Sequence, residues 1–294
     1  MPPGPARFAA DLPPVFIGSD AVTAGILTPR QLRSDAVVPV LHGVYRPRWV
    51  LPTHALRCAA ACLLTSEEVL ITGRSAATVL DVDLARTDDE VEAVVPFGVA
   101  APRIRGVRVR RASSPVGRGD DRAGVRLVDA LRLGFDLAAR QPRPRAVAHL
   151  DAAARAGLID LARLGSWALT SHDDDVVAVR EAIVRADPRA ESLPESQVRV
   201  ILRDAGFDVA VQYVVHGPHG RIIRADLALP DLRIAILYDG AWHALRSQLE
   251  RDRRQARLLQ EAGWVAVHIT AEVLASPRQV VAVVQTAVDA RQAS

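Results

Sequence analysis

The spacing of apolar positions in the last hundred residues changes period several times, and each period predicts a different element. Val198, Ile201 and Leu202 recur at helical spacing in a segment that ends at Gly206, which indicates an α-helix. Three segments with strand patterns follow, then a helix closed by Gly263, another strand and a final helix. The expected ranges are helix 195–205, strands 209–215, 221–229 and 232–238, helix 247–262, strand 264–270 and helix 271–290. This αβββαβα order predicts a mixed sheet sandwiched by helices.

The first fifty residues show a different pattern, of two short helices and a hairpin. A helix over 20–25 ends at glycine, and Thr28 before a proline is a good cap for a second helix over 28–33. Residues 37–49 alternate as a hairpin that turns at His42-Gly43. Helix, helix, hairpin is the order of a winged helix-turn-helix, in which the second helix reads DNA. A small helical cap with solvated arginines explains the same pattern equally well. The DNA-contacting candidates are Arg30 and Arg33 on the second helix and Arg46 and Arg48 on the hairpin.

Between these parts, residues 54–187 carry helices and two strands, over 91–96 and 107–111. A turn-rich linker, 187–194, marks a boundary. We therefore expect an α/β (α+β) protein with three parts: a winged-helix region at 1–53, a mixed α+β middle domain at 54–187 and a C-terminal domain at 188–294.

Composition limits the partners and the cellular location that we expect, but it does not assign a function. The 294 residues carry a net charge of only +3, and all 37 basic residues are arginine. A planar guanidinium suits phosphate, although the overall charge does not indicate a polyanion partner. Cys58 and Cys62 lie on one face of an apolar helix, which is typical of buried thiols. Because no segment is apolar for long enough to span a bilayer, we expect a cytoplasmic protein with no membrane partner.

The candidate chemistry lies at one end of the C-terminal sheet. Asp226 sits near the end of one expected strand, and Asp239 ends the next. Gly240 permits a sharp turn that brings His243 back towards these carboxylates, and Glu195 at the start of the first helix can approach the same edge. Carboxylates that hold a divalent cation, with an imidazole for proton transfer, are what metal-assisted phosphodiester hydrolysis requires. These residues predict a catalytic site with Mg²⁺, or Mn²⁺ in its place, held by Asp226 and Asp239.

Several short motifs occur here in a recognisable order: Pro194-Glu195-Ser196, Arg224-Ala225-Asp226, residues 238–243 (YDGAWH), residues 251–254 (RDRR) and residues 262–264 (AGW). In this order they resemble the restriction-endonuclease-like fold, and most closely the domains related to very-short-patch repair (Vsr) endonucleases. The resemblance covers about residues 191–274. It implies a DNA nuclease core in which Asp226 binds metal and His243 acts as acid, base or phosphate contact. On such a core the arginines of the following helix would meet phosphates, although they are also typical of a solvated face: Arg251, Arg253 and Arg254.

One position departs from the nuclease pattern. Leu237 stands where these enzymes generally have a glutamate, and Asp239 stands where they have a lysine. Vsr-type enzymes also carry an apolar residue there and use a main-chain carbonyl, which implies the carbonyl of Tyr238 as a metal ligand. A decayed nuclease that still folds is the alternative. Asp239-Gly240 is also a common turn pair, and Glu195 is also a favourable charge at a helix N-terminus.

The N-terminal half has a second resemblance. The segments 21–25 (AVTAG), 27–32 (LTPRQL), 40–45 (VLHGVY) and 72–77 (TGRSAA) are similar to bacterial AbiEi-type antitoxins, over about residues 15–150. That family implies a DNA-binding winged helix followed by a mixed domain. It leaves a homodimer or a toxin-like protein partner open.

Two functions therefore remain. The first is a metal-dependent DNA endonuclease whose winged helix holds the substrate. The second is a catalytically inactive DNA-binding regulator of antitoxin type that keeps the nuclease fold as a scaffold. Convergence of Asp226, Asp239 and His243 within coordinating reach would favour the enzyme. A cleft filled by Leu237, with Asp239 turned to solvent, would favour the regulator.

Overall fold

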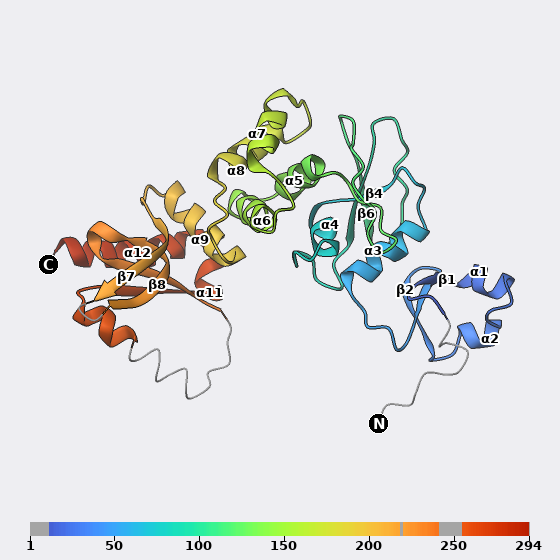
Figure 1. Cartoon of the computed structure of the whole chain (residues 1–294), viewed down its shortest axis with the longest axis horizontal. Helices are drawn as coiled ribbons and strands as arrows, with labels where there is room; N and C mark the ends of the chain where they lie inside the picture. Colours follow the sequence, from blue (N-terminus) through green and yellow to red (C-terminus); the bar gives the residue numbers. More distant parts are fainter. Residues whose placement is uncertain (1–11, 218–219, 241–254, 294) are drawn as a thin grey trace. The chain divides into compact units, whose positions relative to one another are not determined.

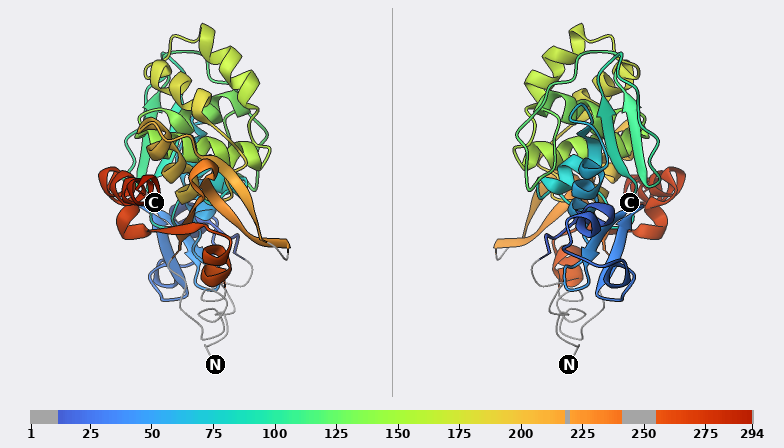
Figure 2. Two further views of the ribbon diagram at one scale, coloured as in Figure 1. Left: turned by 90° about the vertical axis from the view of Figure 1, so that its left-hand side faces the viewer. Right: turned by 90° about the vertical axis from the view of Figure 1, so that its right-hand side faces the viewer.

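The computed structural model describes residues 12–217, 220–240 and 255–293. Helices and sheets with parallel and antiparallel pairing give the α/β (α+β) fold expected from the sequence (Figure 1, Figure 2). The chain forms two compact units, and the division does not follow chain order. The first unit comprises residues 1–139 and 156–177, and the second comprises residues 140–155 and 178–294. The predicted middle domain therefore contributes two helices to the second unit, residues 143–155 and most of 176–185.

The start of the first unit contains the two short helices and the hairpin expected there. A short strand that the sequence pattern did not indicate precedes them and completes a three-stranded antiparallel sheet of order β1-β3-β2. Thr28 caps the second helix through a reciprocal capping box with Gln31, as its position before a proline suggests. Phe16, Leu27 and Val37 are among the residues of the small core. The elements are β1 (Phe16–Ile17), α1 (Gly18–Thr23), α2 (Pro29–Leu32), β2 (Val37–Leu41) and β3 (Val44–Pro47).

The rest of the first unit is built on a second three-stranded sheet, of order β4-β5-β6. Strands β4 and β5 are antiparallel, whereas β5 and β6 are parallel. Strand β5 is buried along its whole length because α3 and α4 pack against it. The elements are α3 (His54–Leu63), β4 (Leu70–Ile71), α4 (Gly73–Val79), β5 (Val91–Val95), β6 (Val107–Arg111), α5 (Ala130–Ala138) and α7 (Leu161–Thr170). The apolar pattern did not indicate β4 or α7.

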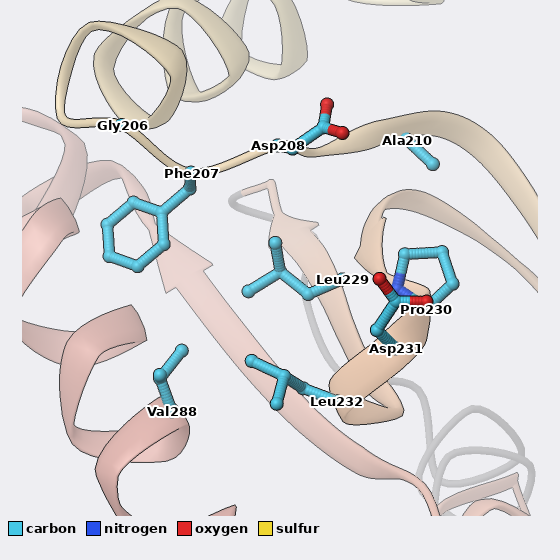
Figure 3. A pocket seen from close by; sticks show the side chains of 9 residues that line it. All are labelled: Gly206, Phe207, Asp208, Ala210, Leu229, Pro230, Asp231, Leu232 and Val288. Carbon is cyan, nitrogen blue, oxygen red and sulfur yellow. The ribbon is translucent and has the colours of Figure 1, made fainter. Parts of the chain in front are cut away.

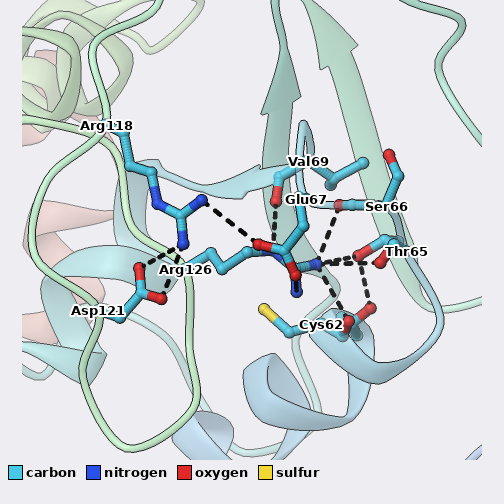
Figure 4. Close-up of polar contacts among 9 residues, drawn as sticks. Cys62, Thr65, Ser66, Glu67, Val69, Arg118, Asp121 and Arg126 are labelled. Atoms are coloured by element: carbon cyan, nitrogen blue, oxygen red, sulfur yellow. Dashed lines mark hydrogen bonds and ion pairs between the residues drawn. The ribbon is translucent and has the colours of Figure 1, made fainter.

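A buried arginine joins the end of α3 to this sheet (Figure 4). The Nη2 of Arg126 donates to the carbonyl of Cys62 at 3.0 Å and to the hydroxyl of Thr65 at 2.8 Å. Its Nε donates to the carbonyl of Val69, just before β4. The last carbonyls of a helix have no partner within the helix; the guanidinium satisfies that of Cys62 and, beyond the helix, those of Thr65 and Ser66. Cys58 and Cys62 are buried free thiols, as expected, and burial raises the pKa of Cys58 to about 12.

The second unit is built around a four-stranded sheet of order β10-β9-β8-β7. Strands β7, β8 and β9 are antiparallel neighbours, and β10 runs parallel to β9. Side chains of α9 and α12 pack with one face of the sheet in a core that includes Leu202, Leu227, Ile236, Ile269 and Val284. The elements are α6 (Arg143–Arg155), α8 (Val176–Arg185), α9 (Leu193–Asp204), β7 (Ala210–Gly217), β8 (Gly220–Leu229), β9 (Ile234–Asp239), β10 (Val265–Thr270), α11 (Ala271–Leu274) and α12 (Pro277–Gln292).

The prediction of one continuous helix over 271–290 is wrong. The chain forms α11 and α12, with Ser276 as the N-cap of the second helix and Pro277 at its first position. A proline has no backbone N–H and clashes with the preceding turn, so it begins a helix more readily than it continues one. Of the predicted helix over 247–262, residues 255–262 lie in the described part; 255–261 are helical and 262 begins a turn.

Candidate active site and nucleic-acid interface

Asp226 lies where two strands of the C-terminal sheet separate. Strands β8 and β9 pair only from Leu227 to Leu229, opposite Ile234 to Ile236, and Asp226 is the next residue of β8 beyond this ladder. Its Oδ2 accepts the backbone N–H of Tyr238 at 2.8 Å. The half-buried carboxylate therefore satisfies a donor that the ended ladder leaves without a strand partner.

Glu195 is held at the N-terminus of α9 by hydrogen bonds from its own chain. Ser192, the N-cap residue, donates its hydroxyl to Oε1 at 2.7 Å. Oε2 accepts the backbone N–H of Glu191 and the side-chain Nε2 of Gln212, each at 2.9 Å. Glu195 is only 9% exposed. The Ser192 hydroxyl also accepts the N–H of Glu195, so Glu195 takes part in the cap of α9, although it accepts the N–H of Glu191 and not that of the N-cap residue as in a capping box.

The two carboxylates line one gap. Asp226 and Glu195 face a space that Leu237, Tyr238 and Val198 also line, and the gap is too narrow to admit a water molecule. Leu237, at the position where nuclease motifs carry an acid, thus lies beside Asp226 rather than away from it. The sequence expectation that Glu195 approaches the edge of the sheet near Asp226 agrees with this arrangement.

The electrostatics of the gap follow from burial and like charge. Burial raises the pKa of Asp226 to about 6, and the carboxylates of Glu195 and Glu191 add to the rise. The N–H of Tyr238 and the guanidinium of Arg224 act in the opposite direction. Arg224 itself pairs with Glu191 at 2.6 Å. Within the described residues neither Asp226 nor Glu195 forms an ion pair with an arginine, so two acidic groups share a partly dry space without a direct counter-charge.

Asp239 lies apart from this gap. It ends β9, is about half exposed, and pairs with His268 on β10, with 3.0 Å between Oδ2 and Nδ1. The parallel register that sets Thr270 beside Asp239 also brings His268 onto the same face. His243 lies outside the described residues. In the described ranges no three side chains of the His, Cys, Asp and Glu types gather closely enough to hold a metal.

The donor set at the gap fits a hard cation only in part. Mg²⁺ takes few carboxylates and keeps several waters, so two acids of the chemistry of Asp226 and Glu195 suffice in principle. Both carboxylates already accept hydrogen bonds from the chain, and the gap has no room for the waters of the ion. Tyr238 contacts Asp226 through its N–H; the metal-ligand role of its carbonyl stays a prediction. Binding an ion here would require Glu195 to leave its cap.

Two residues of this neighbourhood were not singled out from the sequence, Gln212 and His268, and Arg224 was named only as part of a motif. Gln212 stands opposite Asp226 on β7, because its neighbours Val211 and Tyr213 pair with Leu227 and Ala225. Its backbone has a φ of +53°, which is uncommon for a residue other than glycine. Register across strands places Gln212 and His268, and a single-strand pattern does not contain that information.

The candidate DNA-binding arginines of the first unit differ in how they are engaged. Arg30 and Arg33, at and just after α2, are exposed and have no side-chain hydrogen bond within the described part of the chain. Arg46 donates to the carbonyls of Pro47 and Arg48, each at 3.3 Å, and Arg48 donates to the carbonyl of Asp35. The hairpin arginines therefore also brace their own loop. The three arginines of the predicted basic helix, Arg251, Arg253 and Arg254, lie outside the described residues.

A larger hollow opens elsewhere on the C-terminal domain, where β8 leads into β9 (Figure 3). Its volume is about 460 Å³, and Phe207, Leu229, Leu232 and Val288 provide its apolar wall. Asp208 and Asp231 also line it. Among the described candidate catalytic residues, Glu195, Asp226 and Asp239 do not line this hollow. None of the helices in the described part has the length and apolar composition needed to cross a membrane.

Comparison with other proteins finds relatives in Mycobacterium tuberculosis. "Uncharacterized protein MT2308" (strain CDC 1551 / Oshkosh) and "Uncharacterized protein Rv2248" (strain ATCC 25618 / H37Rv) are each 30% identical to this chain over 251 residues. The match covers 82% of this chain and 88% of each relative. No family model and no solved structure matches the chain. At this identity and coverage, the chain belongs to the same family as these two mycobacterial proteins.

Proposed function

We propose that this protein is a DNA-binding regulator of antitoxin type, in which the nuclease-like C-terminal domain is a scaffold and not a hydrolase. The observation that carries the proposal is the separation of Asp239 from the gap that Asp226 and Glu195 share. Asp226 and Glu195 accept hydrogen bonds from their own chain in a gap with no room for water, Leu237 takes the place of the expected acid, and Asp239 is turned towards His268. This is the arrangement expected of the regulator.

The DNA contact is assigned to the N-terminal region. A sheet of order β1-β3-β2 supports α1 and α2, and the exposed Arg30 and Arg33 are available for phosphates. The predicted arginines at 251, 253 and 254 would add phosphate contacts from the C-terminal domain. A toxin-like protein remains a candidate partner from the AbiEi resemblance alone.

A second candidate function is metal-dependent endonuclease activity, and one observation favours it. The carboxylates of Asp226 and Glu195 share a gap without a direct arginine counter-charge in the described residues, and the pKa of Asp226 is raised to about 6. A divalent ion would relieve this repulsion. In that case Asp226 and Glu195 would hold Mg²⁺ or Mn²⁺, which lowers the pKa of an attacking water, and His243 would transfer a proton.

One set of assays separates the two functions. The intact protein is incubated with supercoiled plasmid and Mg²⁺ or Mn²⁺, beside Asp226→Ala and Leu237→Glu. The regulator predicts no nicking by the wild-type protein. Nicking that disappears in Asp226→Ala would overturn the proposal and establish the endonuclease. Nicking by Leu237→Glu alone would identify a decayed nuclease and support the regulator.

DNA binding is measured on a fluorescein-labelled duplex by anisotropy across a range of salt concentrations. We expect Asp226→Ala to bind like the wild-type protein. The Arg30→Ala plus Arg33→Ala variant should bind more weakly, and its salt slope should fall by about 1.8 if each arginine neutralises one phosphate. A variant with two other exposed arginines replaced, Arg163→Ala plus Arg278→Ala, is the matched control. Equal salt slopes for the two double variants would contradict the assignment of α2.

A further inference from the structure

One stretch of the first unit has a charge far from that of the whole chain. Residues 93–119 contain six arginines and no aspartate or glutamate, whereas the 294 residues together carry a net charge of +3. Five of the six arginines fall within residues 103–111, on β6 and the segment before it. We call these five the basic edge: Arg103, Arg105, Arg108, Arg110 and Arg111.

The fold places the basic edge on an open side of a sheet. In the described part of the chain β6 pairs only with β5, so it is a border strand. Arg110 is half-buried and the other four arginines are exposed. Among the described residues, Arg108 pairs with Glu92 at 2.8 Å and Arg111 donates to a backbone carbonyl. Arg103, Arg105 and Arg110 have no such contact there, which leaves three guanidinium groups for an external anion.

The segment before β6 is held firmly. The carbonyl of Gly106 accepts the N–H of Val91 at 3.0 Å. Gly106 has a φ of +85°, and a Cβ at this position would lie 3.0 Å from Nη2 of Arg57 and 3.3 Å from Leu41. The arginines on either side of Gly106 are therefore presented from a fixed backbone. A row of like charges on fixed backbone repels itself and gains when it meets a polyanion.

An exposed aromatic ring lies in the connection that leads into the basic edge. Phe97, in the connection from β5 to β6, is 75% exposed. Nε of Arg111 donates to the carbonyl of Val99 at 3.2 Å, which ties this connection to the end of β6. Arginines that follow a phosphate backbone, beside an aromatic face on which bases stack, are the two elements of single-strand recognition. A duplex offers phosphates to the arginines, but its bases are already stacked and give Phe97 no partner.

We propose that the basic edge, with Phe97, binds a single-stranded nucleic acid. The phosphates lie along Arg103, Arg105 and Arg110, and an unpaired base stacks on Phe97. This goes beyond the proposed function, because it needs neither α2 nor the C-terminal domain. DNA and RNA strands share this chemistry, and the choice between them is measured directly.

The test uses the intact protein and three fluorescein-labelled probes: a 20-nucleotide thymidine DNA strand, a 20-nucleotide uridine RNA strand and a 20-base-pair DNA duplex. Anisotropy is recorded over a range of NaCl concentrations. The variant Arg103→Gln, Arg105→Gln, Arg110→Gln is compared with a control that loses three exposed arginines elsewhere, Arg86→Gln, Arg163→Gln, Arg278→Gln. We expect the salt slope for a single strand to fall by about 2 in the first variant and to be unchanged in the control.

Phe97→Ala separates stacking from charge. It should weaken single-strand binding about tenfold and leave duplex binding unchanged. Equal single-strand affinities and salt slopes for the basic-edge variant and its control would overturn the proposal. Equal losses of single-strand and duplex binding in Phe97→Ala would also overturn it, as would binding to phosphatidylserine vesicles without binding to either strand. The tighter of the DNA and RNA arms identifies the ligand.

The outcome is independent of the winged-helix assignment. If Arg30→Ala plus Arg33→Ala abolishes duplex binding while the single strand still binds, both proposals stand. If duplex binding proves absent and single-strand binding remains, only the proposed function fails. If the duplex binds and neither single strand does, only the basic-edge proposal fails. Thermal unfolding of each variant, expected within about 2 °C of the wild-type Tm because the replaced side chains are exposed, checks that the fold is intact.

Discussion

Two buried acidic regions of the second unit differ in their counter-charges. Asp151 on α6 and Arg199 on α9 are both fully buried and pair at 2.5 Å. Asp226 and Glu195 line a narrow gap, and their described partners are N–H and hydroxyl groups. A buried carboxylate with a guanidinium partner joins two helices. Two carboxylates without a guanidinium partner repel each other. Such repulsion is expected either where a cationic ligand binds or where a former binding site has been lost. The difference distinguishes acids that hold the fold together from acids that carry or once carried chemistry.

The first unit also contains buried carboxylates that are neutralised by an arginine. Arg132 binds both carboxylate oxygens of Asp136, at 2.7 and 2.9 Å, and also reaches Asp173 at 3.1 Å. Thr72 donates its hydroxyl to Asp136, and the hydroxyl of Ser114 and the backbone N–H of Ser113 donate to Asp173. Neither aspartate is a candidate for catalysis, because every donor around it is structural. In the described chain Asp226 and Glu195 lack such an arginine partner, and they are therefore the acidic groups there that bear on function.

The largest effect should come from breaking the neutralised pair. Arg199→Met leaves the buried carboxylate of Asp151 without its partner, and we expect a loss of about 3–5 kcal/mol in the free energy of unfolding. Urea denaturation followed by circular dichroism measures it. Asp151→Asn in the same chain keeps an acceptor for the N–H of Asp187 and should recover at least half of the loss. No recovery in the double variant would show that Arg199 acts through packing and its bond to the carbonyl of Arg185.

Removing charge at the other region should have the opposite sign. Asp226→Asn keeps an oxygen for the N–H of Tyr238 but removes the repulsion from Glu195 and Glu191. We expect a gain of the order of 1 kcal/mol at pH 8, discounted because the carboxylate is partly exposed. The exposed neighbour Asp231→Asn is the matched control and should change little. Destabilisation by Asp226→Asn would mean that the carboxylate has a cationic partner outside the described residues.

The same substitution tests how the free energy of unfolding depends on pH. The pKa of Asp226 is about 6 in the folded protein and ordinarily 3.8, so between these pH values the folded protein holds a proton that the unfolded chain releases. Its stabilising contribution is complete below about pH 4 and is lost as the pH rises through about 6. The free energy of unfolding of the wild-type protein relative to Asp226→Asn should therefore fall between pH 4 and 6 and level off above. A flat difference would contradict the shared gap.

Local patterns predicted much of the fold but little of its pairing. The helix α9, the strands β7 to β10 and the hairpin of the first unit follow from periodicity, glycines and caps that lie within each segment. The parallel register of β9 and β10, which brings His268 to Asp239, depends on a partner about thirty residues away, so no local signal contains it. Helix α6 joins the second unit for the same reason. The serine-proline pair at Pro277 indicates the break between α11 and α12. The helical spacing of apolar residues on both sides of it led to the prediction of a single helix.

The candidate site divides in the same way. Asp226 and Glu195 were found from motif order, and the structure places them on one gap. The role of Asp239 could not be judged from its position on the strand alone, because a neighbouring strand supplies its partner. The roles of His243 and of the arginines at 251, 253 and 254 stay predictions, since these residues lie outside the described chain.

The smallest effect is expected at the exposed pair. Asp239 and His268 are each about half exposed, so water screens their interaction. Exposed ion pairs contribute about 0–1 kcal/mol, and we expect His268→Ala to lower the free energy of unfolding by no more than about 0.5 kcal/mol in 0.05 M NaCl and by less in 1 M NaCl. Urea denaturation at the two salt concentrations measures it. A loss above about 1.5 kcal/mol would mean that Asp239, like Asp151, stabilises the fold through its cationic partner. The difference between the two kinds of acidic group would then depend on the presence of a cationic partner and not on burial.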